Sequence, residues 1–237
     1  NAWVNRGGGL EIWRELYKPF NIYPIPCGNT GTQMFGWFNR EINSLDDLKG
    51  LKMRIPGVGG EVFKRAGGNP VNIPGGELYT AMQTGTIDAV EWVGPYNDLA
   101  FGFQQVAKYY YYPGWHEPGS MLELLVNDDA WDSLPSDLQA IIETAAKAVN
   151  QDLLDEYTAL NNKALKELIE THGVELRKLP DDVMAEFKKI SDEIIAESLS
   201  DETVKKVYTS FQDFLGEVSE YHSIAEDAFI EARSSSD

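Results

Sequence analysis

Signals for a helical turn and for a strand follow one another in the stretch Leu45-Asp-Asp-Leu-Lys-Gly-Leu-Lys-Met-Arg-Ile-Pro56. Ser44 stands before Asp46 and Asp47, which is the pattern of a capped helical turn. The apolar run Leu51–Ile55 that comes next predicts a strand, because it is short and lies between a glycine and a proline. Helix and strand in such close alternation indicate an α/β architecture.

The same alternation extends through the first half of the chain. Gly-rich breaks separate short apolar runs, and helical patterns cover Gly59–Ala66 and Gly76–Thr84. The apolar runs that predict further strands are Ile22–Pro26, Met34–Phe38, Ile87–Val93, Tyr109–Tyr112 and Met121–Val126. We therefore predict an α/β region over residues 1–126.

The second half of the chain predicts a very long helix. Apolar residues recur at three-and-four spacing from Leu138 to Ile169, and neither Pro nor Gly interrupts them before Gly173. A cap candidate and a proline, in Ser133-Leu-Pro135, mark the start. A helix of about 37 residues is about 55 Å long, which is enough to span two lobes or to protrude towards a partner. A strand over Val174–Lys178 and helices that begin near Asp181 and Glu202 complete the predicted region 127–237.

The composition fits an ordered globular chain and excludes several kinds of partner. Of the 237 residues, 43% are hydrophobic and 24% are charged, and the formal net charge is -18. This excess of acid argues against nucleic acid and against an anionic membrane surface, since both need a basic face. The charge is -2 over residues 1–127 and -16 over residues 128–237, so an anionic ligand is better tolerated in the first half.

Few residues are available for soft metal sites or for disulfides. The single cysteine, Cys27, excludes an intrachain disulfide and a Cys-based zinc site. The three histidines, at positions 116, 172 and 222, are far apart in the sequence, which argues against a histidine-rich metal centre. No apolar run approaches the roughly 18 residues of a transmembrane helix.

Four polar residues suit one kind of site if the fold brings them into one cleft. Arg54 offers a fork of donors that matches a carboxylate. The side chains of Gln33, Glu91 and Glu117 offer hard oxygen ligands for Na⁺ or Ca²⁺. Two buried glutamates beside an arginine need a cation or a proton to be stable. Ordinary structural interpretations stay open for three residues, since Arg54 and Glu91 could face solvent and Trp92 could belong to the core.

At this point the sequence resembles a known family, the solute receptors of TRAP transporters (tripartite ATP-independent periplasmic transporters). The resemblance runs from residue 1 to about residue 220, and several motifs occur in the order that the family shows. It is carried by Leu45–Pro56, Ala81–Ala89, Glu91–Asn97, Gly119–Val126 and Gly173–Pro180. Within the family, Gly28–Gln33, Glu91-Trp92 and Trp115-His-Glu117 resemble the subgroup that binds 2-oxo or 2-hydroxy acids together with a metal ion.

The resemblance implies a fold, a function and a set of ligand-binding residues. The fold is an α/β, two-lobed periplasmic-binding-protein-like fold with a long helix spanning both lobes and a helical C-terminus. The function is binding of a small monocarboxylate such as pyruvate or lactate, with no catalytic cofactor and with Na⁺ or Ca²⁺ bridging the substrate. Arg54 would hold the carboxylate and Asn29 would donate a further hydrogen bond. The metal ligands would be Gln33, Glu91, Trp92 through its backbone carbonyl, and Glu117, with Trp92 also beside the substrate.

The resemblance also implies a location and partners. The receptor would work in the periplasm and deliver its solute to the TRAP membrane permease subunits. A homodimer would form through the C-terminal helices, where Phe211, Phe214, Leu215 and Tyr221 are apolar enough to serve. Family members extend further at the N-terminus. We therefore expect a fragment in which residues 1–126 carry most of the ligand cleft and the other lobe is only partly present.

Two other functions remain open from the sequence. Glu91 and Glu117 could form the acid–base pair of a hydrolase, although no nucleophile motif or cofactor loop accompanies them. The long acidic helix could instead belong to a helical interaction or dimerisation fragment that binds no ligand. We favour a binding protein that is not an enzyme.

Overall fold

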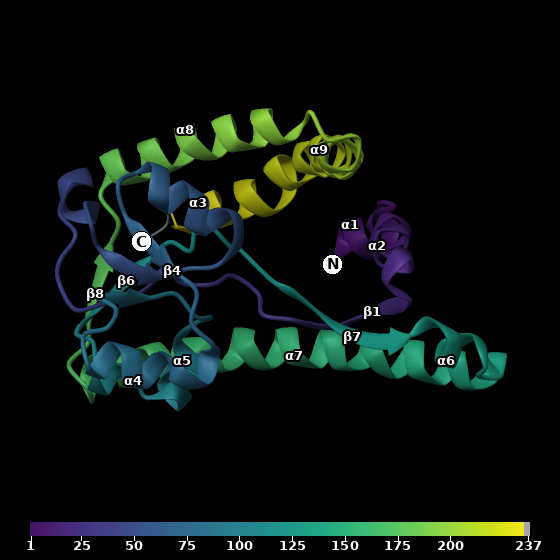
Figure 1. Cartoon of the computed structure of the whole chain (residues 1–237), viewed down its shortest axis with the longest axis horizontal. Coiled ribbons are helices and arrows are strands. Elements are labelled where there is room, and N and C mark those ends of the chain that lie inside the picture. Colours follow the sequence, from purple (N-terminus) through teal and green to yellow (C-terminus); the bar gives the residue numbers. More distant parts are fainter. Residues whose placement is uncertain (235–237) are drawn as a thin grey trace. The chain divides into compact units, whose positions relative to one another are not determined.

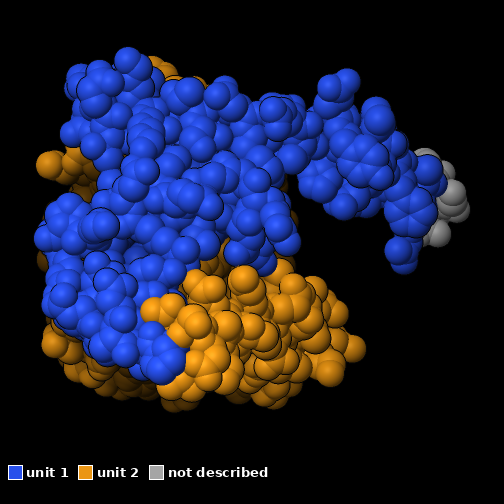
Figure 2. Space-filling model, turned by 90° about the vertical axis from the view of Figure 1, so that its right-hand side faces the viewer, with its two compact units in different colours: residues 1–24, 125–135, 195–237 blue, residues 25–124, 136–194 orange. Residues whose placement is uncertain are grey.

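The computed structural model describes residues 1–234, and its contacts divide them into two compact units (Figure 2). The first unit contains Asn1–Pro24, Leu125–Pro135 and the chain from Ile195 onward. The second unit contains Ile25–Leu124 and Ser136–Ile194. Each unit is thus built from segments that are distant in the sequence. The predicted division into residues 1–126 and 127–237 refers to the two lobes that the family resemblance implies, and it stays a prediction.

A six-stranded mixed sheet lies at the centre of the second unit (Figure 1). Three neighbouring strands, β4, β3 and β5, are parallel, whereas β2 runs antiparallel to β5 and to β6, and β6 pairs with β8 in parallel. In sheet order the strands are β4 (Asn69–Val71), β3 (Lys52–Arg54), β5 (Ala89–Val90), β2 (Gly36–Phe38), β6 (Tyr109–Tyr112) and β8 (Glu175–Lys178).

Helices cover both faces of this sheet, which makes a three-layer α/β unit (Figure 1). Successive side chains of a strand point to opposite faces, so each central strand supplies both layers. Trp37 and Tyr110 pack under α4 (Leu78–Gln83) and the end of α7 (Ser136–Glu170). Their neighbours Phe38 and Tyr111 pack under α3 (Gly57–Arg65) and α8 (Asp181–Ser198). This burial on both sides explains why the tyrosine run is a strand, as predicted.

The predicted long helix is present as α7, a single helix of 35 residues that lies wholly in the second unit. It ends before Gly173, whose φ of 67° favours glycine. The prediction that Ser133 caps the start of this helix is wrong, because the helix begins at Ser136. The Ser133 hydroxyl instead donates to the carbonyl of Ala130, 2.7 Å away, at the C-terminal end of the preceding helix. The division into two units does not test whether this helix spans two lobes, and its spanning role stays a prediction.

The first unit is mainly helical. Trp3 packs edge-on against Phe211 at 5.4 Å between ring centroids, and the indole Nε1 donates to Ser210 Oγ at 3.2 Å. Asp201 caps the long helix of this unit by accepting from the backbone N–H groups of Thr203 and Val204. Its helices are α1 (Ala2–Arg6), α2 (Gly9–Tyr17), α6 (Asp128–Asp132), α9 (Glu202–His222), the π-helical η5 (Ser223–Asp227) and α10 (Ala228–Ser234).

Surface-exposed apolar side chains occur on the C-terminal helices, where the dimer was predicted. Phe211, Leu215 and Tyr221 are exposed, whereas Phe214 contributes to a groove of about 710 Å³ beside Gly7. The dimer itself stays a prediction. Across residues 1–234, every helix is either too short or too polar to cross a bilayer.

Some elements differ from the sequence prediction for identifiable reasons. The predicted strand Ile87–Val93 is reduced to two residues in β5, because Glu91 and Trp92 leave the ladder to form the site described below. Three elements, β4, α2 and α5 (Pro95–Phe101), were not predicted. Glycine and proline lie in or beside them, and these residues usually interrupt regular secondary structure. A separate ladder joins β1 (Ile22–Asn29) to β7 (Met121–Asn127). The remaining short helices are η1 (Lys18–Phe20), η2 (Leu45–Leu48), η3 (Gly75–Glu77) and η4 (Phe103–Gln105).

Candidate functional site

Two parallel strands bring the main charged residues of the site together. Arg54 is the last residue of β3, and Glu91 follows the last residue of β5. Arg54 lies opposite Val90 in the parallel register, and the Glu91 N–H donates to the Arg54 carbonyl at 3.0 Å. The side chains therefore meet at the carboxyl ends of the strands, which is where open α/β sheets bind ligands.

The Arg54 side chain is fixed by Glu91 on one edge only. Its Nη1 donates to Glu91 Oε2 at 2.9 Å and to the Glu91 carbonyl at 3.0 Å. The side chains are 14% and 2% exposed, so the pair is largely withdrawn from water. Arg54 Nε is buried and has no hydrogen-bond partner. The guanidinium also lies over the Trp92 ring at 5.4 Å, which helps to orient it.

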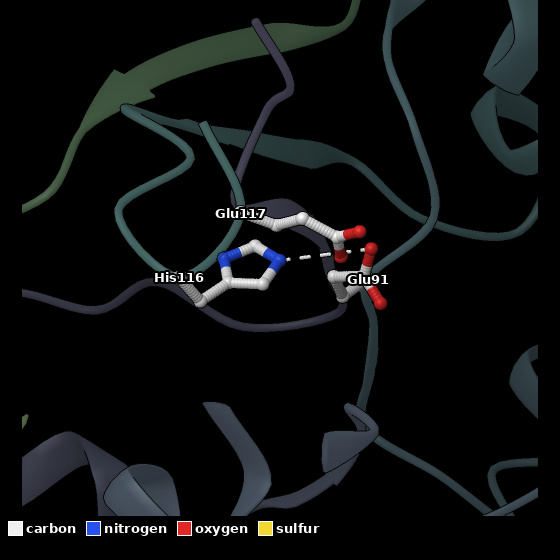
Figure 3. A group of neighbouring side chains, drawn as sticks. All are labelled: Glu91, His116 and Glu117. Atoms are coloured by element: carbon white, nitrogen blue, oxygen red, sulfur yellow. Dashed lines mark ion pairs between the residues drawn. The ribbon is translucent and has the colours of Figure 1, made fainter. Parts of the chain in front are cut away.

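Two further side chains, His116 and Glu117, converge on Glu91, and each of the three offers an atom that can bind a metal ion (Figure 3). The ligand atoms of Glu91, His116 and Glu117 all lie within 4.8 Å of one another. His116 Nε2 is 3.6 Å from Glu91 Oε1, and the imidazole is only 3% exposed. Both ring nitrogens of His116 are buried without a hydrogen-bond partner. Its ring packs against Phe35 and Trp115, with centroids 5.8 and 5.6 Å away, and these two rings also contact each other.

Gln33 joins the same group through a chain of hydrogen bonds. Its Nε2 donates to Thr30 Oγ1 at 3.0 Å, and that oxygen also accepts from the Ser120 N–H at 3.0 Å. The Ser120 hydroxyl in turn donates to Glu117 Oε1. Gln33 is 4% exposed, and its Oε1 is buried with no hydrogen-bond partner. This amide therefore has its donor satisfied and its acceptor available.

Close backbone packing holds Gln33 in place. A Cβ added to Gly114 would lie 2.4 Å from the Gln33 carbonyl oxygen, which is a distance that no side chain tolerates. The chain between β6 and Glu117 can thus approach Gln33 only because glycine stands at this position.

Trp92 and Asn29 lie near the group but make other contacts. The Trp92 indole donates to Asn97 Oδ1 and packs against Phe101 at 4.7 Å between ring centroids. Asn29 Oδ1 accepts from the Gly31 N–H at 2.8 Å, which orders the loop that leads to Gln33. The roles predicted for the Trp92 carbonyl and for Asn29 stay predictions.

A further buried carboxylate, Asp98, supports the segment that carries Glu91 and Trp92. Its Oδ1 accepts from the N–H groups of Val93 at 3.1 Å and Gly94 at 3.0 Å. Its Oδ2 accepts from Trp37 Nε1 at 2.9 Å and from the Tyr110 hydroxyl at 2.7 Å. Burial raises the pKa of Asp98 to about 6, although these four donors oppose the shift. Asp98 stands outside the polar stretches of the sequence that indicate a site.

The residues present fit a hard cation. Two glutamates face one arginine, and Gln33 Oε1 is a buried acceptor that lacks a donor. A cation would balance the excess carboxylate and satisfy that oxygen. The structure thus joins Arg54, Gln33, Glu91 and Glu117, which the sequence had grouped. It adds His116, whose signal was its place in the polar stretch Trp115-His-Glu117.

Comparisons with known proteins agree with this geometry. A profile of the bacterial extracellular solute-binding proteins of family 7, the DctP family, matches residues 2–202. A monocarboxylate 2-oxoacid-binding periplasmic protein of Nostoc sp. is 44% identical over 235 residues, which are 99% of this chain and 65% of that protein. The chain therefore spans just under two thirds of the length of this relative.

Two crystal structures share the fold closely. A TRAP periplasmic solute-binding protein from Pseudoalteromonas atlantica, with bound sodium and pyruvate, is 45% identical with a TM-score of 0.92, over 97% of this chain and 70% of that one. A TRAP transporter solute-binding protein from Bordetella bronchiseptica is a mixed-occupancy dimer with calcium and picolinate in its bound site. It is 41% identical with a TM-score of 0.94, over 100% of this chain and 70% of that one. These likenesses confirm the predicted fold class, and the match over residues 2–202 shows that the chain belongs to family 7 of the bacterial extracellular solute-binding proteins.

Proposed function

We propose that the chain is the solute receptor of a TRAP transporter and binds a small 2-oxo or 2-hydroxy monocarboxylate together with Na⁺ or Ca²⁺. It would act in the periplasm and deliver the acid to the membrane permease. Its relatives support this proposal, since one is a 2-oxoacid-binding periplasmic protein and another holds sodium and pyruvate.

One observation carries the proposal. Arg54 Nε is a buried donor without a partner, and Gln33 Oε1 is a buried acceptor without a partner. Leaving either atom unsatisfied costs about 1–3 kcal/mol. An anion alone would satisfy only the arginine, and a cation alone would satisfy only the glutamine. A carboxylate with a bound cation satisfies both atoms.

The solute class follows from these two requirements. The carboxylate of the acid would pair with the free edge of Arg54, for which a planar fork is well suited. An oxygen on the adjacent carbon would let the acid contact the cation through two atoms. The cation would supply positive charge to balance the two glutamates, of which Glu91 is buried and Glu117 is partly buried. Gln33, Glu91, Glu117 and the Trp92 carbonyl would hold it, and His116 is an additional ligand candidate from the structure.

We also propose that this site binds rather than catalyses. Glu91 is held in an ion pair with Arg54, and Glu117 accepts a hydrogen bond from Ser120. Each carboxylate is thus engaged by a donor of the protein itself, and no nucleophile motif or cofactor loop accompanies the pair.

A thermal-unfolding screen tests the function. We would heat the chain with pyruvate or lactate, each with Na⁺, Ca²⁺ or a chelator, and use acetate as the matched acid that lacks the second oxygen. A ligand present at 100 times its dissociation constant stabilises a protein by about 2.7 kcal/mol. We expect stabilisation that needs both the 2-oxygenated acid and a cation. A cooperative transition unchanged by every combination would contradict the proposal.

A further inference from the structure

Asp98 connects the middle of the sheet to the backbone of the candidate site. It belongs to α5 and is 1% exposed. Trp37 and Tyr110, which bind its Oδ2, lie opposite each other on β2 and β6, and their rings stack at 4.1 Å. This side of the carboxylate is therefore anchored to two buried residues of neighbouring strands. The other oxygen, Oδ1, is free to act on the segment that follows β5.

The first peptide unit that Asp98 binds is the one between Trp92 and Val93. Its N–H, on Val93, donates to Asp98 Oδ1 at 3.1 Å. In a planar trans peptide the carbonyl points opposite to the N–H, so the Trp92 carbonyl must face away from Asp98. A carboxylate acceptor also polarises the peptide and draws negative charge onto that carbonyl oxygen. Asp98 thereby sets both the direction and the donor strength of the predicted Trp92 ligand.

The second peptide unit, between Val93 and Gly94, is hydrogen-bonded to the backbone that follows Gln33. Its N–H, on Gly94, donates to Asp98 Oδ1 at 3.0 Å. Its carbonyl, on Val93, accepts from the Met34 N–H at 3.0 Å. That N–H belongs to the peptide unit that Gln33 begins. One carboxylate oxygen is thus linked, through two adjacent peptides, to the backbones of two predicted cation ligands.

We propose that Asp98 is the positioning residue of the cation site, which orients the Trp92 carbonyl directly and the Gln33 backbone through the Val93 carbonyl. This inference rests on the proposed receptor function. Groups that orient metal ligands in this way typically change metal affinity by about 10- to 100-fold when they are replaced.

A pair of matched variants tests the inference. Asp98→Asn removes the charge from the oxygens that bind Trp37, Tyr110 and the two peptides. Tyr110→Phe removes one donor on the Oδ2 side and leaves the Oδ1 contacts in place. With calorimetry in excess pyruvate, we expect Asp98→Asn to weaken Ca²⁺ affinity by about 10- to 100-fold. We expect Tyr110→Phe to lower thermal stability while the Ca²⁺ affinity stays within about threefold. Affinity that falls equally in both variants would show a merely structural role.

A spectroscopic measurement on the unaltered chain does not depend on the folding of a variant. In NMR spectra recorded with pyruvate, adding Ca²⁺ should shift the carbonyl carbon of Trp92 and the amide proton of Val93, because they share one peptide unit. Binding of Ca²⁺ and pyruvate that leaves both resonances unmoved would overturn the inference and leave the receptor function standing. A chain that binds neither ligand would overturn the proposed function and the inference with it.

Discussion

Arg54 uses one nitrogen, Nη1, to bind both the carboxylate and the backbone carbonyl of Glu91, while its Nε is buried with no partner. The glutamate therefore holds the guanidinium in a fixed orientation from one side. The opposite edge keeps its donor for a ligand. An arginine fixed in advance loses little freedom when a carboxylate binds, which favours affinity for a small solute.

Replacing Arg54 with alanine should affect both binding and stability. We expect Arg54→Ala to lower pyruvate affinity by more than about 100-fold, since the charge-assisted fork is lost. It should also cost about 3–5 kcal/mol of unfolding free energy, because Glu91 stays buried without its partner. The double variant Arg54→Ala with Glu91→Gln should recover part of the stability and none of the affinity. Calorimetry and urea unfolding measure the two effects, and retained pyruvate affinity in the single variant would remove Arg54 from the site.

Glu117→Gln should weaken cation binding while the local fold persists. The amide oxygen can still accept from the Ser120 hydroxyl, so that the loop stays in place. Loss of one hard anionic oxygen should lower Ca²⁺ affinity by at least about tenfold. Glu170→Gln removes the same charge from an exposed residue of α7 that is not a candidate ligand, and salt screens an exposed charge, so the Ca²⁺ affinity of this variant should be unchanged. Equal Ca²⁺ affinities for the two variants, measured by calorimetry, would exclude Glu117 as a ligand.

A methyl group added at Gly114 should displace the backbone of Gln33 and so disturb the site. Gly114→Ala places the new Cβ against the Gln33 carbonyl oxygen, and the backbones must separate to accommodate it. We expect a loss of about 1–3 kcal/mol in unfolding free energy and weaker Ca²⁺ binding. Gly76→Ala is the matched control, because an added Cβ there meets nothing within 4 Å. If both variants melt and bind alike, the close approach at Gly114 is not required.

Asp98 should leave a signature in the pH dependence of stability. Its pKa is about 6 in the folded chain and about 3.8 in the unfolded chain, so at pH 5 only the folded state is protonated at this group. The sign of the linkage is therefore stabilisation on acidification, and the contribution of this group rises by about 1 kcal/mol between pH 7 and pH 5. Subtracting the urea-unfolding curves of Asp98→Asn from those of the unaltered chain isolates this component. A difference that does not vary with pH would contradict the raised pKa.

Local patterns predicted the elements well and the contacts between them less well. Tyr109–Tyr112 and Leu51–Ile55 could be recognised as strands, because the tyrosine run suits burial on both faces and the second run alternates buried apolar residues with more exposed polar ones. The meeting of Arg54 with Glu91 depends on the register of β3 against β5, which no local pattern encodes. The ligand chemistry of the two residues grouped them only on condition that the fold brings them together, and the resemblance to TRAP receptors supplied the expectation that they share one site.

Two residues of the site were missed for different reasons. His116 was visible in the polar stretch, but the carboxylate beside it suited a hard cation better, and only the fold shows that both ring nitrogens are buried in the cluster. Asp98 gave no signal, because its four donors come from three separate segments of the chain. Such a carboxylate is recognisable only after the segments have packed.

Replacing His116 should raise the stability of the ligand-free chain and weaken the binding of the cation. Two imidazole nitrogens that are buried without hydrogen-bond partners cost free energy in the ligand-free chain. His116→Leu keeps an apolar group beside Phe35 and Trp115 and removes both unsatisfied atoms. We expect the ligand-free chain to gain about 1 kcal/mol of unfolding free energy. We expect the affinity for Ca²⁺ with pyruvate to fall by at least about tenfold, because a buried polar group that opposes folding is retained where it serves a ligand. Urea unfolding of the chelator-treated chain and calorimetry measure the two quantities. A variant that loses stability and keeps its affinity would show that the imidazole serves the fold alone.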